Sequence, residues 1–239
     1  VNPDLEFEPE SIHEVLRVAL ADHTQVACWE FRQKPYEHPK HYDPVTGLAN
    51  WVSHACVLMR RSAIESIGGW ESRLFMYCED VAMSYRLREA GHQLRYCPRA
   101  VVWHRSYGDP TEVKRAQYVG SAVGQVFLRL RFGTWQDAWV AAAVFMHRML
   151  TAPASWRREI FQKGIGILGR FPGLRAERLW YRPKNPVYFP FRGLDYELRR
   201  AGDFVFCEHL AILRKSYEDH GGMTIEDKQD FQVAESFNW

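Results

Sequence analysis

The chain has 239 residues, of which 46% are hydrophobic and 25% charged, so it can bury a sizeable core. A net charge of only +2 excludes a strong overall field that would attract nucleic acid, which we do not expect as a partner. The five cysteines form no Cys-x-x-Cys pair, which indicates reduced thiols rather than disulfides or a zinc site. With no membrane-spanning apolar run and no signal peptide, we expect a cytoplasmic protein, peripheral at most at the inner face of the cell membrane.

Residues 1–109 alternate predicted helices and strands, which is typical of an α/β layer structure. The clearest helix covers residues 11–22, where Ser11 and Glu14 also fit a capping box. No strand is expected before this helix, so the region is interpreted as the second half of a domain. A loop containing three prolines is expected at residues 32–50. The other elements expected here are strands at 25–31, 54–61, 93–98 and 100–104, and helices at 62–70 and 81–90.

Residues 110–182 are predicted to form a basic helical region. Twelve lysines and arginines against four acidic residues leave a local excess of eight positive charges. A helix start at Asp109-Pro110 is followed by predicted helices at 111–131, 135–150 and 155–168. The C-terminal extension, residues 183–239, opens with a proline-rich segment and contains a predicted helix near 205–219. It carries no functional signal.

Two adjacent carboxylates, Glu79 and Asp80, stand immediately before the predicted helix at 81–90. Backbone N–H groups and the helix dipole can hold a carboxylate ionised at such a place. An ionised carboxylate in a fixed position can accept a proton from a hydroxyl group, which is the task of a general base. The alternative interpretation is a simple helix cap.

The motifs around this pair resemble, in order and spacing, those of family 2 glycosyltransferases with a GT-A fold. The resemblance covers about residues 1–107. It rests on Asn2-Pro3-Asp4, Trp51, Arg60-Arg61, Gly68-Gly69, Phe75, Glu79-Asp80, Arg86-Leu87, Gly91, Tyr96, Pro98 and His104. It implies a partial GT-A domain, Rossmann-like with a mixed sheet, followed by an α-helical C-terminal extension. The nucleotide-binding βα units of the family are expected before residue 1 or from another polypeptide.

The resemblance also implies roles for individual residues. Asp80 would be the catalytic base and Glu79 would orient the acceptor or the base. Asp4 and His104 would bind Mg²⁺ or Mn²⁺ on the diphosphate of a nucleotide sugar, where the cation acts as a Lewis acid. Asn2 stands where the family has the first acid of its metal motif, and an amide oxygen is a weaker ligand. Trp51 lies where an acceptor-facing aromatic is often found; the alternative is a core residue.

Two further regions have open interpretations. The loop at 32–50 is either a lid near the acceptor, with His38 and Lys40 suited to bind pyrophosphate or acidic sugars, or an ordinary surface loop. The basic helices are either a solvated face or a contact with an anionic membrane. The membrane contacts would be Arg129, Arg131, Arg157, Arg158 and Lys163.

The expected function is that of an inverting, metal-dependent glycosyltransferase. It would move a sugar from a nucleotide-sugar donor to a glycan or lipid-linked acceptor in cell-surface polysaccharide synthesis. Two alternatives from other classes remain: a non-catalytic module that binds glycan or a partner, and an adaptor at a membrane surface.

Overall fold

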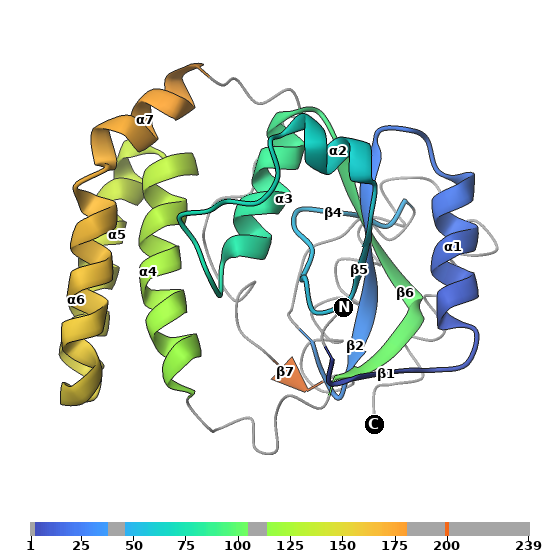
Figure 1. Ribbon diagram of the computed structural model, residues 1–239, viewed down its shortest axis with the longest axis horizontal. Helices are drawn as coiled ribbons and strands as arrows, with labels where there is room; N and C mark the ends of the chain where they lie inside the picture. The colour runs from blue at the N-terminus through green and yellow to red at the C-terminus, as the bar shows by residue number, and fades with distance from the viewer. Residues whose placement is uncertain (1–2, 38–45, 105–113, 181–198, 201–239) are drawn as a thin grey trace, which may run out of the picture.

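The computed structural model describes residues 3–37, 46–104, 114–180 and 199–200 (Figure 1). In chain order the elements are β1 (Leu5–Phe7), α1 (Ser11–Ala21), β2 (Val26–Lys34), β3 (Tyr36–Glu37), β4 (Leu48–Ala49), β5 (Val57–Met59), α2 (Arg61–Ser66), α3 (Glu79–Glu89), β6 (Gln93–His104), α4 (Arg115–Phe132), α5 (Trp135–Thr151), α6 (Ala154–Leu168), α7 (Phe171–Trp180) and β7 (Arg199–Arg200).

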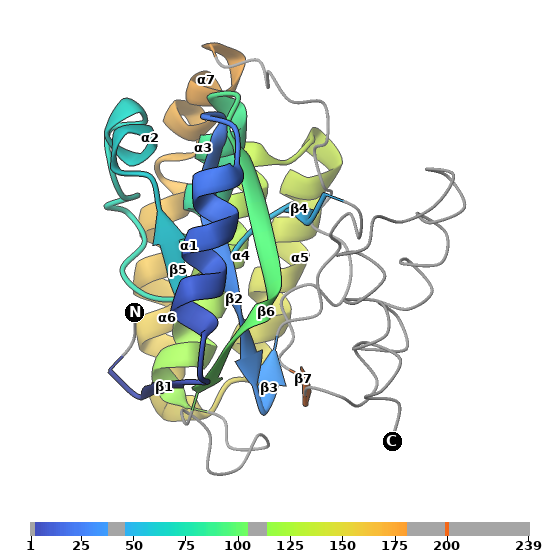
Figure 2. The ribbon, with the colours of Figure 1, turned by 90° about the vertical axis from the view of Figure 1, so that its right-hand side faces the viewer.

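The centre of the fold is a mixed sheet with the strand order β1-β6-β2-β5. The two long strands β2 and β6 are parallel, while β1, β4 and β5 join them in antiparallel pairs. Figure 2 shows α1 in front of the sheet and the C-terminal helices behind it. Apolar residues fill both interfaces, Val15 on the α1 side and Met83 and Leu87 on the α3 side. The expected α/β class with a helical C-terminal part is confirmed.

The sheet differs from the sequence prediction at several points. Strand β2 continues to Lys34, so it takes in the first three residues of the expected loop at 32–50. The two extended segments predicted at 93–98 and 100–104 form one strand, β6. A short strand, β1, does precede the first helix, contrary to expectation. Three residues are too few for a periodicity signal, and β1 exists only because β6 offers it a pairing edge.

The predicted capping box of α1 is wrong. The residue before the helix is Glu10, in the left-handed region with φ 65°, and no side chain caps the helix. The hydroxyl of Ser11 donates instead to the carbonyl oxygen of Val101 at 2.8 Å, and it accepts from the Val101 amide at 3.0 Å. This buried exchange attaches the first turn of α1 to β6. The sequence pattern predicted a local hydrogen bond for Ser11, but in the structure its hydroxyl bonds with Val101, 90 residues away.

Helix α4 packs against the outer side of α3, and α5, α6 and α7 pack in turn against α4 (Figure 1). Helix α4 begins at Arg115, four residues later than predicted, whereas α5 and α6 lie within one residue of the predicted bounds. One hydrophobic core contains Leu74 and Val81 from the first region and Phe127 and Leu128 from α4. The core therefore crosses the boundary predicted near residue 109. Within the described ranges, no helix is both long and apolar enough to cross a bilayer.

Candidate functional site

The paired carboxylates open helix α3 and lie in a constrained turn. Tyr77 and Cys78 have φ values of 67° and 68°, and Glu79 and Asp80 are the first two helical residues. The Oδ1 atom of Asp80 accepts a hydrogen bond from the amide of Val81 at 2.8 Å. The pair therefore sits among the amide groups at the positive end of α3, which stabilise negative charge.

The two carboxyl groups have unequal surroundings. The Oε2 atom of Glu79 is buried and has no hydrogen-bond partner in the part of the chain that the structure describes. Burial, and next the charge of Asp80, raise the pKa of Glu79 to about 7. Glu79 is therefore protonated in a large fraction of molecules at neutral pH, which reduces the repulsion within the pair. When their surroundings give two neighbouring carboxyl groups different pKa values, one can act as an acid and the other as a base.

Helix α4 supports this turn through two glycines. A methyl group added at Gly120 would lie 2.4 Å from the carbonyl oxygen of Met76. One added at Gly124 would lie 2.6 Å from Cβ of Cys78. Only glycine allows the turn to approach the helix so closely. The helical extension thus fixes the backbone from which the two carboxylates project.

Asp4 and His104 come together at the β1–β6 pair, where His104 lies opposite Leu5. The Oδ2 atom of Asp4 is 3.4 Å from Nε2 of His104. The other ring nitrogen of His104, Nδ1, is 3.0 Å from the amide oxygen of Gln33. An amide oxygen can only accept a hydrogen bond, so the Nδ1 atom of His104 carries the hydrogen that it shares with Gln33. Burial lowers the pKa of His104, which favours the neutral ring.

These two side chains fit a hard or borderline cation as a partial site. A histidine that binds a metal through one nitrogen usually donates its other N–H to an oxygen, as His104 does to Gln33. Among the described residues no group of three or more His, Cys, Asp and Glu side chains is placed to hold a metal. Asp4 and His104 would thus supply two ligands, and diphosphate oxygens and water would have to supply the rest.

The first turn of α3 and the carboxyl end of β6 lie at the same end of the sheet, because α3 and β6 run in opposite directions (Figure 1). Ligands of open α/β sheets bind at this end. That Asp80 faces the same cleft as Asp4 and His104 stays a prediction.

Of the three predicted acceptor-binding residues, the structure describes only Trp51. Trp51 is 3% exposed and packs in the core with Val81 and Ala82. A ring so covered offers no free face to a sugar, so its burial favours the alternative interpretation as a core residue. His38 and Lys40 lie outside the described residues.

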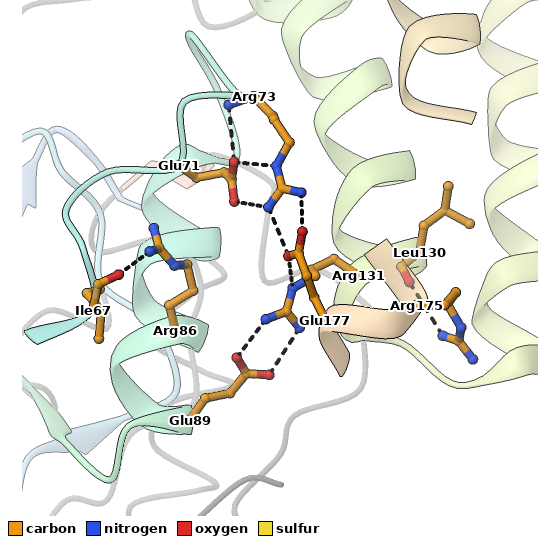
Figure 3. A network of polar contacts seen from close by, with 9 residues as sticks. All are labelled: Ile67, Glu71, Arg73, Arg86, Glu89, Leu130, Arg131, Arg175 and Glu177. Carbon is orange, nitrogen blue, oxygen red and sulfur yellow. Dashed lines mark hydrogen bonds and ion pairs between the residues drawn. The ribbon is translucent and has the colours of Figure 1, made fainter. Parts of the chain in front are cut away.

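An ion-pair network ties the region around α3 to the C-terminal helices (Figure 3). Arg73 contacts Glu71 and Glu177, each at 2.6 Å, and Arg131 contacts Glu177 at 2.9 Å and Glu89 at 3.3 Å. Burial alone would raise the pKa of Glu71, but the hydrogen bonds from Arg73 outweigh it and hold this pKa below its ordinary value. The network spans the predicted domain boundary and helps to fix α3.

The same network corrects part of the predicted membrane surface. Arg131 is 7% exposed and Arg129 9%, so neither side chain can lie on a bilayer. Their charges face the interior of the helical layer, where Arg131 pairs with acids from α3 and α7. The sequence alone could not distinguish these two arginines from exposed ones, because it shows where the charges are but not which side chains other segments cover.

Sequence reasoning missed two features near the candidate site. Gln33, which orients His104, was assigned to a loop because the strand prediction stopped at residue 31. Trp70, Phe75 and Met76 are exposed on the segment that leads to Glu79, with Phe75 at 92%. The available signal was three large apolar side chains within the seven residues that follow the Gly68-Gly69 pair.

The comparisons with known proteins bear on this half of the fold. Residues 10–119 match the family model described as "Glycosyltransferase like family 2". This region is family 2 glycosyltransferase-like. The resemblance expected from the sequence is confirmed, and the mixed sheet with its covering helices agrees with a partial GT-A domain.

The curated relatives of this region are named for the sugars that they transfer or polymerise. The chain is 41% identical over 100 residues to an N-acetylglucosaminyl-diphospho-decaprenol L-rhamnosyltransferase of Mycobacterium tuberculosis, covering 40% of this chain and 32% of that protein. It is 31% identical over 64 residues to the poly-beta-1,6-N-acetyl-D-glucosamine synthase of Staphylococcus epidermidis, covering 27% of this chain and 15% of that protein. The chain thus spans about a third or less of the length of these relatives.

Proposed function

We propose that the protein is an inverting glycosyltransferase that moves a sugar from a nucleotide-sugar donor to a lipid-linked or glycan acceptor in cell-surface polysaccharide synthesis. The observation that carries the proposal is the Glu79–Asp80 pair, held at the start of α3 inside a region that matches family 2. The rhamnosyltransferase relative, whose name includes a diphospho-decaprenol, supports a lipid-linked acceptor.

In the proposed reaction Asp80 accepts the proton of the acceptor hydroxyl as the new glycosidic bond forms and the bond to the diphosphate breaks. Inversion requires attack from the side opposite the leaving group, so the base and the diphosphate site must come from different segments. Asp80 is on α3, whereas His104 ends β6 and Asp4 immediately precedes β1, so the proposed base and the proposed diphosphate site come from different segments. Glu79, with a pKa raised to about 7, is protonated in about half of the molecules at neutral pH and in that form can donate a hydrogen bond to the acceptor or to Asp80.

Asp4 and His104 are the residues that would hold Mg²⁺ or Mn²⁺, with Gln33 orienting the histidine. A cation bound there would supply Lewis-acid stabilisation of the leaving diphosphate. Through that cation the two residues would position the diphosphate.

The test uses the complete gene product that contains this chain. Transfer of labelled sugar into an organic-extractable N-acetylglucosaminyl-diphospho-polyprenol is measured for the wild type, for Asp80→Asn and for the exposed control Glu65→Gln. We expect Asp80→Asn to lose at least about 10²-fold in kcat, the usual contribution of a general base, with donor binding retained. Wild-type transfer that survives Asp80→Asn would refute the assignment.

The alternative, a non-catalytic glycan-binding module, predicts a different result. It predicts that the wild type binds glycan without transferring sugar and that Asp80→Asn leaves binding unchanged. Sugar transfer by the wild type in the presence of donor separates the two functions, because only the transferase shows it.

A further inference from the structure

Helix α5 carries a continuous apolar stripe on its exposed side. Trp135, Trp139, Met146 and Leu150 are 65%, 78%, 57% and 69% exposed. Their spacings of four, seven and four residues place them on one face of the helix. The stripe is about 22 Å long at the rise of an α-helix.

This stripe is separate from the face that holds α5 in the fold. Ala141 and Phe145 are buried, and Phe145 packs so closely on α6 that a methyl group at Gly164 would lie 2.1 Å from its ring. Trp135 also contacts Phe171 of α7, with the ring centres 5.9 Å apart, so the exposed part of the stripe is formed mainly by Trp139, Met146 and Leu150. Single exposed apolar residues are common, whereas a run of large ones on one helix face marks a binding surface.

The charges beside the stripe are mainly positive. Arg157 donates to the carbonyl oxygens of Leu150 and Ala152, each at 2.9 Å, which holds its guanidinium at the C-terminal end of the stripe. Arg158 follows it and is exposed. At the other end the guanidinium of Arg175 lies 4.4 Å from the centre of the Trp135 ring, but this side chain is 8% exposed and donates to the carbonyl oxygens of Leu130 and Gly133, so it adds no charge to the surface.

The acidic residues of α5 and α6 do not offset this charge. Between residues 135 and 168 the only two are Asp137 and Glu159. Asp137 is engaged in the capping box with Thr134. Glu159 pairs with Arg115 at 2.8 Å and with Lys163 at 2.9 Å. The surface around the stripe therefore complements a negatively charged partner.

We propose that α5 lies flat in the interface of a bilayer that contains anionic lipid, with Trp139 and Leu150 inserted among the acyl chains and Arg157 and Arg158 at the phosphates. Tryptophan prefers the boundary between headgroups and hydrocarbon, and an apolar stripe beside cations is the pattern of helices that bind there. The charge complementarity favours lipid over a second copy of this chain, which would carry the same positive charge. The proposal is independent of the transferase chemistry.

The test is sedimentation of the chain with vesicles of phosphatidylcholine, with and without phosphatidylglycerol. The double variant Trp139→Glu and Leu150→Glu is compared with Leu20→Glu, a change at an 86% exposed leucine of α1 on the other side of the sheet (Figure 2). We expect the double variant to lower the partition coefficient by at least about tenfold and Leu20→Glu to leave it unchanged. Removing phosphatidylglycerol should also weaken binding.

Three results would overturn the proposal. One is a wild type that does not sediment with the phosphatidylglycerol vesicles, and another is an equal loss in Leu20→Glu. The third is a wild-type dimer, seen by light scattering, that the double variant converts to a monomer while vesicle binding persists. If the double variant does not fold, quenching by brominated lipid decides: we expect wild-type fluorescence to be quenched, and Trp139→Phe to bind equally but show less quenching. Equal quenching in both proteins contradicts the proposal.

Discussion

Replacing Gly124 with alanine should disturb the turn that carries the candidate base. The new Cβ would lie 2.6 Å from Cβ and 2.8 Å from Sγ of Cys78, and 2.9 Å from the carbonyl oxygen of Tyr77. Backbone atoms cannot yield without shifting the first turn of α3. We estimate an overpacking cost of about 1–3 kcal/mol. The better helix propensity of alanine offsets about 1 kcal/mol of this cost.

Gly166→Ala is the matched control, because that glycine is also in a helix and a Cβ there would meet nothing within 4 Å. Gly166→Ala should gain about 1 kcal/mol from propensity alone. The free energies of unfolding of the two variants, from urea titration, should therefore differ by the steric cost of about 1–3 kcal/mol. Sugar transfer by the complete gene product should fall in Gly124→Ala and not in Gly166→Ala. A Gly124→Ala protein as stable as Gly166→Ala would refute the close packing of α4 on the turn.

Three further outcomes are expected. Arg131→Met should destabilise the chain by about 3 kcal/mol in urea unfolding, because the buried Glu89 carboxylate loses its Arg131 partner, and adding Glu89→Gln should recover part of the loss. The pKa of Glu79 rises from 4.5 to about 7 on folding, so the native state holds this proton more tightly than the unfolded state does. The free energy of unfolding should therefore fall as the pH rises from about 4.5 to 7. In thermal melts across that range, Glu79→Gln should flatten this dependence, and an unchanged slope would contradict the prediction. His104→Ala should abolish Mn²⁺ binding, as measured by electron paramagnetic resonance. The control variant His13→Ala, at an exposed histidine, should keep it. Equal Mn²⁺ binding by the two variants would exclude the Asp4–His104 site.

The site was partly readable from the sequence. The approach of Asp4 to His104 follows from motif positions in the resemblance, and the structure places the two side chains 3.4 Å apart. Glu79 and Asp80 were expected just before α3 and are in fact its first two residues. Motif spacing works here because each motif sits at the end of a strand or helix, where local chain direction largely fixes its position. The metal and base roles stay predictions.

The sequence by itself determined the elements whose signal is local. Helix α1 follows from apolar periodicity and the end of α3 from the stop signal at Gly91, and α5 and α6 were also predicted, because a helix closes its hydrogen bonds within a few residues. Tertiary structure alone decided which side chains are covered. Trp51 and Arg131 look like surface candidates in the sequence, and both are buried by residues distant in the chain. Burial depends on which faces meet, and the packing of α4 on α3 fixes those faces through contacts that no local pattern encodes.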